Sequence, residues 1–327
     1  MRYVIYGAGA IGGVIAAELA RHGHDVAVIA RGAHLEAIRA RGLTLECPDE
    51  TVTQRIAAYG HPREVAFTPD DVVLLCMKTQ DTTAALAALE EAAGPDVPVF
   101  CVQNGVENER LALRRFARVY GVLVIMPATH LEPGIVQSYS TPLHGILDLG
   151  RYPSGTDALA EEVAATLSAS RFSARALTDV MRWKYAKLLS NLSNALQAIC
   201  GLGREWGDLS ARAVDEALAC YRAAGIACAG REEMDARRRD AMREQPIAGR
   251  AREGGSSWQS LARGAGSIEA DYLNGEIVLL GRLHGVPTPV NELLRRTADR
   301  MARERLAPGA VTADDLRAAL ADVPART

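Results

Sequence analysis

The start of the chain constrains the fold more than any other stretch. The apolar run RYVIY at residues 2–6 predicts a β-strand; it leads directly into GAGAIG, a helical stretch to Arg21 and a second strand, DVAVIA. In this setting the first glycine of G-x-G-x-x-G permits a tight turn, the second admits a pyrophosphate, and the third lets the helix pack closely. The helix N-terminus adds amide donors. We predict a dinucleotide site formed by Gly7, Ala8, Gly9, Ala10, Ile11 and Gly12.

The end of the second strand bears on which dinucleotide binds. An NAD site usually carries an acidic residue there to accept the ribose hydroxyls. This chain instead has Ile29-Ala30-Arg31, and a guanidinium pairs well with a phosphate. The residues therefore favour NADP(H), with Arg31 at the 2′-phosphate. The alternative is that Arg31 only begins a surface helix.

Two further strand ends carry polar side chains. Lys78 follows DVVLLCM and Asn104 follows VFCVQ. Ligands bind at the carboxyl ends of strands in open α/β sheets, so both residues are candidates for the same crevice. Taken singly, Lys78 could be a solvated helix cap, and Asn104-Gly105 could be a simple turn.

The whole chain divides into two regions of different periodicity. Its 327 residues are about twice an average domain. Strands alternate with helices at first, with a strand pair near 43–56, antiparallel segments near 134–140 and 144–149, and a last strand near 173–176; beyond these the pattern is helical, with a helix and an irregular connection at 231–255. We predict an α/β protein: an N-terminal Rossmann-type doubly wound sheet in residues 1–176, followed by a mostly α-helical C-terminal domain in residues 177–327.

Composition excludes several classes of function. The net charge of −3 argues against a surface that binds nucleic acid. We interpret the run Arg237 to Arg239 as the solvent-exposed face of a helix. No window has the roughly 18 apolar residues of a membrane span, and no export signal precedes the first strand. The six cysteines are scattered and form no metal-binding motif, so we expect no metal and a reducing cytoplasm.

A second group of candidates lies in the helical region. On an ideal helix Lys187, Asn191 and Asn194 share one face of the otherwise apolar stretch KLLSNLSN. A ligand pocket would satisfy these polar groups, and lysine suits protonation of a developing alkoxide. A solvent-facing polar stripe is the alternative. Downstream lie Ser257 and Glu269, and for Glu269 a surface position is the alternative.

Together these residues resemble the ketopantoate reductase family over nearly the whole chain. The resemblance rests on GAGAIGG, on Lys78 and Gln103-Asn104-Gly105, and on SSWQSLARGAGSIEADYLNGEIVLLGRLHGVPTPVN. It implies reduction of 2-dehydropantoate to pantoate with NADPH in pantothenate biosynthesis. It implies these roles: Lys187 as general acid, Glu269 at the substrate hydroxyl or orienting Lys187, Asn191, Asn194 and Ser257 on substrate, Asn104 between cofactor and substrate, and Lys78 near the nicotinamide.

The chain departs from the family pattern at the substrate helix. Its asparagines are three residues apart where many members have four, and Trp183 lies four residues before Lys187 instead of two, which makes Lys184 a second candidate for the proton donor. Two other functions remain open: a paralogue that reduces a different 2-oxo acid, and an NADP(H)-binding sensor without turnover. Apolar helix faces and the family's habit suggest a homodimer.

Overall fold

The computed structural model describes residues 1–203, 205–239 and 241–321. Contacts divide the chain into two compact units. The first comprises Met1–Lys184 and Gly230–Arg252, and the second comprises Tyr185–Ala229 and Glu253–Thr327. The first unit thus extends past the expected boundary at residue 176 and includes a segment that the sequence analysis assigned to the C-terminal domain.

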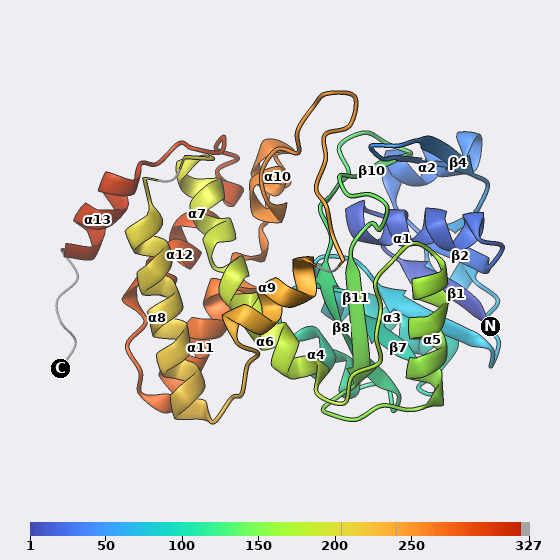
Figure 1. Ribbon diagram of the computed structural model, residues 1–327, viewed down its shortest axis with the longest axis horizontal. Helices are drawn as coiled ribbons and strands as arrows, with labels where there is room; N and C mark the ends of the chain where they lie inside the picture. The colour runs from blue at the N-terminus through green and yellow to red at the C-terminus, as the bar shows by residue number, and fades with distance from the viewer. Residues whose placement is uncertain (204, 240, 322–327) are drawn as a thin grey trace. The chain divides into compact units, whose positions relative to one another are not determined.

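The first unit is built on a seven-stranded sheet in the order β11-β8-β7-β6-β1-β2-β5 (Figure 1). Its strands are β1 (Arg2–Tyr6), β2 (Asp25–Ile29), β5 (Ala57–Tyr59), β6 (Asp71–Leu75), β7 (Val99–Cys101), β8 (Val119–Ile125) and β11 (Ile146–Arg151). Neighbouring strands run parallel except β11, which is antiparallel to β8. Because β2 and β6 flank β1 on opposite sides, the strand order reverses at β1, where open sheets of this kind bind ligands. The predicted Rossmann-type sheet is confirmed.

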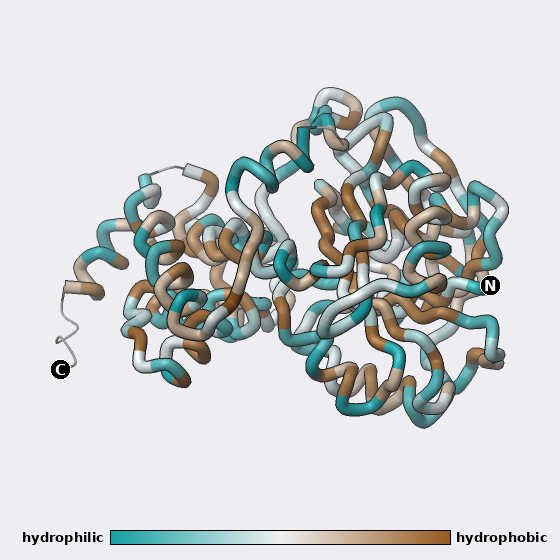
Figure 2. Tube along the Cα trace, turned by 60° about the horizontal axis from the view of Figure 1, so that its bottom comes forward, coloured by the Kyte–Doolittle hydropathy of each residue, from teal (hydrophilic) through white to brown (hydrophobic). Residues whose placement is uncertain are grey.

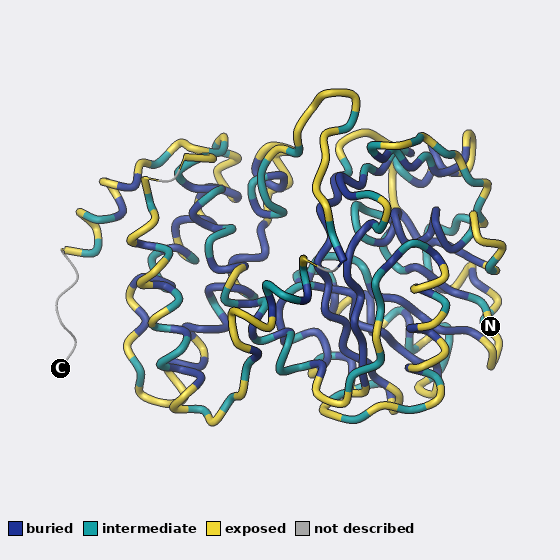
Figure 3. The backbone as a smooth tube through the Cα atoms, in the orientation of Figure 1, coloured by how far each residue is buried: buried dark blue, intermediate teal, exposed yellow. Residues whose placement is uncertain are grey.

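Helices cover both faces of this sheet because its strands are apolar on both sides. On one face Ile5 belongs to a core with Val14 of α1 (Ala10–Arg21) and Leu167 of α5 (Ala158–Ala169). On the other face Val4 belongs to a core with Leu86 of α3 (Thr79–Ala93) and with α4 (Asn108–Leu113). Figure 2 shows the central strands as mostly hydrophobic, and Figure 3 shows the same strands as mostly buried.

A second, smaller sheet was not predicted as a separate element. It has the order β4-β3-β10-β9, formed by β3 (Leu43–Glu46), β4 (Thr51–Gln54), β9 (Ala128–Thr129) and β10 (Ile135–Ser138). It packs closely on α1, since a Cβ added to Gly13 would lie 2.5 Å from Cγ1 of Val136. The strand pair expected near 43–56 is present as β3 and β4. Residues 173–176, expected to form a strand, make only isolated bridges to β11.

The segment from Gly230 to Arg252 joins the first unit through a buried ion pair. Arg237 of α9 (Arg231–Arg239) contacts Asp148 of β11 at 2.6 Å, and the two side chains are only 3% and 2% exposed. The interpretation of Arg237 as part of a solvated helix face was therefore wrong. The guanidinium of Arg237 can be buried because the carboxylate of Asp148 neutralises its charge. The ion pair is one contact between this segment and the sheet.

The second unit is helical. Its elements are α7 (Ser193–Cys200), α8 (Gly207–Ala224), α10 (Ser256–Ala262), the 3-10 turn η2 (Glu269–Tyr272), α11 (Asn274–His284), α12 (Pro289–Arg303) and α13 (Ala313–Ala321), together with the end of α6 (Val180–Asn191). The stretch 187–194 runs from α6 into α7 through Leu192, whose backbone keeps right-handed helical angles and whose amide donates to the Leu188 carbonyl at 3.2 Å. Within the described residues, no helix combines the length and apolar character required to span a bilayer.

Candidate active site

The glycine loop after β1 has the shape that its sequence predicts. Gly7 has φ of +102°, and its amide donates to the Ile29 carbonyl at 2.9 Å, so it forms the tight turn. A Cβ added to Gly12 would collide with the Gly7 carbonyl oxygen, which explains the need for glycine where α1 passes over the loop. A Cβ added to Gly9 would meet nothing within 4 Å.

The open space at Gly9 fits the pyrophosphate of a dinucleotide. Gly9 is the N-cap of α1, and no side chain caps the helix there. The first-turn amides of a helix have no partner within the helix, and together with the helix dipole they favour an anion. The backbone of residues 7–12 therefore provides a cradle that a side chain at position 9 would fill.

Arg31 lies where the sequence analysis placed it, immediately after β2. It is the N-cap of α2 (Gly32–Arg41), and its side chain is 77% exposed. Its guanidinium contacts the Asp81 carboxylate of α3 at 3.2 Å. Binding of a 2′-phosphate at Arg31 stays a prediction, and the acidic neighbour is a feature that the sequence analysis missed.

The loops that carry Lys78 and Asn104 are tied together by buried amides. Lys78 is the half-buried N-cap of α3. Next to it, the Met77 carbonyl accepts a 2.8 Å hydrogen bond from Nε2 of Gln103. Nδ2 of Asn108 donates both to the Asn104 carbonyl at 3.2 Å and to Oγ1 of Thr79 at 3.1 Å. The ends of β6 and β7 thus form one supported edge, as expected for neighbouring parallel strands.

Lys184, the second candidate for the proton donor, is buried in the first unit and contacts only groups of that unit in the interactions described next. Its ammonium lies 2.6 Å from Oε1 of Glu109 and donates to the carbonyls of Gln103 at 2.9 Å and Val122 at 3.1 Å. Burial raises the pKa of the Glu109 carboxyl, against the opposing effect of Lys184. An ammonium has three protons to donate, so these three oxygens occupy the group completely.

Lys187 is placed differently. It is half-buried, and its ammonium donates to Oδ1 of Asn191 at 2.6 Å. Asn191 itself is 2% exposed and ends α6. The two residues are brought together as expected from their spacing on a helix.

Asn194 lies in α7, two residues past Leu192 and close to the start of α10. A Cβ added to Gly255, the N-cap of α10, would come within 3.1 Å of its Oδ1. Ser257 follows on α10 and is 3% exposed, and Glu269 on η2 is 6% exposed. The surface position that was the alternative for Glu269 is therefore excluded.

A buried amide network that the sequence analysis did not identify contacts the junction of α6 and α7 at Leu192. Nδ2 of Asn274 donates to the Leu192 carbonyl at 3.3 Å and to Oδ1 of Asn291 at 3.0 Å. Asn291 in turn donates to the Glu216 carboxylate at 2.8 Å. The available signal was the pair of amides in YLNGE and PVNE, within a segment that otherwise predicts apolar helices.

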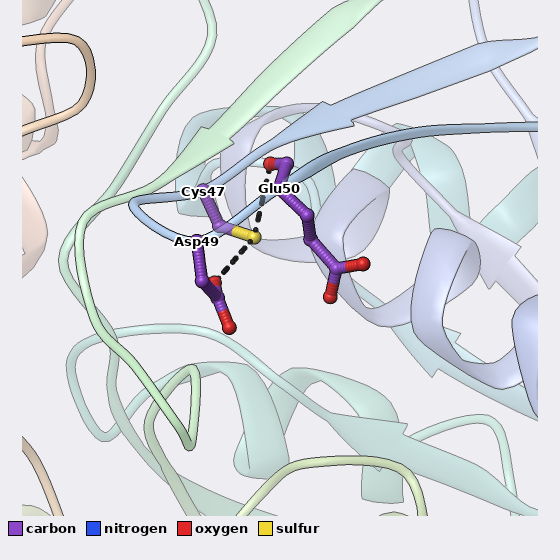
Figure 4. A group of neighbouring side chains, drawn as sticks. All are labelled: Cys47, Asp49 and Glu50. Carbon is purple, nitrogen blue, oxygen red and sulfur yellow. Dashed lines mark hydrogen bonds between the residues drawn. The ribbon is translucent and has the colours of Figure 1, made fainter.

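One cluster has side chains of the types that bind metals: Cys47, Asp49 and Glu50 (Figure 4). The thiol donates to Asp49, and burial together with this carboxylate raises the pKa of Cys47 to about 11. Arg171 pairs with Asp49 at 2.9 Å, and Arg21 pairs with Glu50 at 2.6 Å. Two guanidinium groups therefore already neutralise the carboxylates.

Comparison with known families matches the N-terminal and C-terminal regions of the chain to models of one family. Residues 3–154 match the family model of the ketopantoate reductase PanE/ApbA, and residues 179–302 match the model of its C-terminal region. The chain belongs to the ketopantoate reductase family. The predicted family and enzyme class, an oxidoreductase of the 2-dehydropantoate 2-reductase type, are confirmed.

Ketopantoate reductases of several organisms resemble this chain over most of its length. It is 29% identical to 2-dehydropantoate 2-reductase of Caulobacter vibrioides, across 89% of this chain and 95% of the relative. The crystal structure of a PanE/ApbA family ketopantoate reductase from Ralstonia eutropha JMP134 superposes with a TM-score of 0.78 at 29% identity, across 93% and 99% of the chains. A ternary structure of D-mandelate dehydrogenase with NADH and anilino(oxo)acetate shares the fold, with a TM-score of 0.80 at 22% identity over 93% and 99%.

Proposed function

We propose that this ketopantoate reductase family member reduces 2-dehydropantoate to pantoate with NADPH, as part of pantothenate biosynthesis. The names of its relatives support the reaction, since those aligned over nearly their whole length are 2-dehydropantoate 2-reductases. The observation that carries the proposal is the hydrogen bond between Lys187 and Asn191. It holds an ammonium group, half-buried, in one orientation on the helix that the family resemblance assigns to the substrate.

Lys187 acts in this proposal as the general acid. NADPH supplies a hydride to the C2 carbonyl carbon of the substrate, and a proton must reach the carbonyl oxygen. Lys187 donates that proton, while Asn191 fixes the direction of its ammonium. Lys184 is the weaker candidate, because Glu109 and two carbonyls already accept its protons.

The remaining polar residues align the substrate. Asn194 and Ser257 are proposed to bind the substrate, with Ser257 at its carboxylate. Glu269 is proposed to accept a hydrogen bond from the substrate hydroxyl or to orient Lys187. Asn104 lies at the supported end of β7 and is proposed to contact both cofactor and substrate. Such alignment contributes to catalysis by removing the entropy of finding a reactive geometry.

The proposed cofactor is NADP(H). The cradle at residues 7–12 suits a pyrophosphate, Lys78 is assigned to the nicotinamide end, and the exposed guanidinium of Arg31 suits the 2′-phosphate. We also propose a homodimer, on the grounds of apolar helix faces and the family's habit. A cytoplasmic location is proposed as well, and the six free thiols support it.

A second candidate is reduction of a different 2-oxo acid by the same chemistry. The spacing on the substrate helix favours it, because Asn191 and Asn194 are three residues apart where many members of the family have four. A change there alters which side chain of a 2-oxo acid is accepted and leaves the proton donor in place.

The test is NADPH oxidation, followed by absorbance, with ketopantoate and a panel of other 2-oxo acids, each repeated with NADH. Selective turnover of ketopantoate supports the first candidate. Turnover of another acid alone supports the second. Tight NADPH binding without turnover of any acid would contradict both and leave a sensor.

A further inference from the structure

His34, on the first turn of α2, connects two parts of the first unit that lie far apart in sequence. Its Nε2 lies 2.7 Å from the carbonyl oxygen of Ala8, in the glycine loop. Its Nδ1 accepts a 2.9 Å hydrogen bond from the amide of Gly134, 100 residues away in the turn before β10. The ring of His130 packs beside it, with the ring centroids 4.1 Å apart.

These two contacts determine the protonation state of the imidazole. Since the Gly134 amide is a donor, Nδ1 must be unprotonated, and Nε2 must carry the hydrogen that Ala8 accepts. A protonated ring has no acceptor for Gly134. Burial and the adjacent His130 lower the pKa of His34 to about 4, so the ring is neutral near pH 7.

The contact with Ala8 also sets the direction of the next amide. The carbonyl of Ala8 and the amide of Gly9 belong to one planar peptide group and point in opposite directions. A hydrogen bond that holds the carbonyl toward His34 therefore turns the Gly9 amide the other way. Gly9 is the position with open space at the start of α1, where the dinucleotide cradle lies.

We propose that His34 is a positioning residue of the dinucleotide site, which fixes the Ala8–Gly9 peptide plane so that the Gly9 amide meets the pyrophosphate. This inference rests on the proposed cofactor binding at residues 7–12. His34 itself contacts the loop and not the cofactor. The small sheet contributes through Gly134, which holds the imidazole from the opposite side.

The experiment measures dissociation constants by calorimetry for two ligands, NADP⁺ and 2′-AMP. Both carry the adenosine 2′-phosphate, and only NADP⁺ has the pyrophosphate. The variant His34→Leu should weaken NADP⁺ about tenfold, equivalent to about 1.4 kcal/mol or one hydrogen bond, and leave 2′-AMP unchanged. Glu36→Leu, an exposed substitution on the same helix, is the matched control and should change neither.

Rescue distinguishes positioning from a general effect on the fold. In His34→Gln the amide nitrogen can donate to Ala8 and the amide oxygen can accept from Gly134, so NADP⁺ binding should recover in part. Unchanged NADP⁺ binding by His34→Leu, or equal weakening of both ligands, would overturn the inference.

The unaltered protein serves as the reference for the proposed function. The titration is repeated with NAD⁺, so that the comparison holds whichever dinucleotide is preferred. If the unaltered protein binds neither, the proposed function fails and this inference fails with it. If it binds one and His34→Leu binds it equally well, only the inference on His34 fails.

Discussion

The ammonium group of Lys187 donates a 2.6 Å hydrogen bond to Oδ1 of Asn191, one helical turn further along α6. Replacing the lysine by alanine removes the proposed proton donor. We expect kcat to fall about 10²- to 10⁴-fold, with the dissociation constant for NADPH unchanged. Steady-state kinetics and a separate binding titration measure the two effects. Turnover that survives the substitution would place the general acid elsewhere.

Lys184, three residues earlier, should affect stability instead. Lys184→Met leaves the Glu109 carboxyl buried without its partner at 2.6 Å, and we expect a loss of about 3–5 kcal/mol in the free energy of unfolding. The double variant with Glu109→Met should recover much of this loss, because both charges are then gone. Urea unfolding measures the difference. A stable Lys184→Met protein without activity would contradict the structural role.

Substitution by alanine should have different effects at two glycines of the cradle, on cofactor affinity at Gly9 and on stability at Gly12. Gly9→Ala adds a Cβ to open space, so the unfolding temperature should not change, whereas the affinity for the dinucleotide should drop at least tenfold. Gly12→Ala forces a Cβ against the Gly7 carbonyl and should destabilise the fold by about 1–3 kcal/mol. Thermal unfolding and calorimetry compare the pair. Normal cofactor affinity in Gly9→Ala would remove the cradle from the binding site.

Arg31 and Asp81 should set the preference between the two cofactors. Arg31→Ala should weaken NADPH about tenfold to a hundredfold and NADH much less, since only NADPH offers a phosphate to the guanidinium. Asp81→Asn removes the carboxylate that contacts Arg31 at 3.2 Å and should strengthen NADPH alone. Fluorescence titration with both cofactors tests this. An unchanged ratio in both variants would exclude the pair from cofactor selection.

Stability of the second unit should depend on pH through Asp299. Burial and the neighbouring Asp271 raise the pKa of Asp299 from 3.8 to about 7, against the nearby Arg295 and Arg303. Between these values the folded state holds a proton that the unfolded state has released. Stability should therefore fall as pH rises from about 4 to 7.

Asp299→Asn, which has no proton to lose, should lack that decline and be more stable than the unaltered protein above pH 7. Unfolding midpoints in urea, measured across this range, provide the comparison. Parallel pH profiles for the two proteins would show that the Asp299 carboxyl does not have the raised pKa.

Local sequence patterns predict the Rossmann-type sheet, the glycine loop and the positions of Arg31, Lys78 and Asn104 at strand ends. These features arise between residues a few positions apart: turn chemistry at Gly7, and side-chain periods that distinguish a strand from a helix. The family resemblance rests on such local motifs, and it implies Lys187 as the general acid.

The pairing of polar residues across long separations depends instead on how the folded chain packs. Arg237, predicted to face solvent, lies buried on Asp148, 89 residues away. Lys184, a candidate proton donor, is held by Glu109. No sequence motif predicts the contacts of His34 with Ala8 and Gly134. A charged or amide group has many possible partners along a chain. The partner is selected by the packing of distant segments, because a buried polar group is stable only where the folded backbone brings a complementary group within hydrogen-bonding distance.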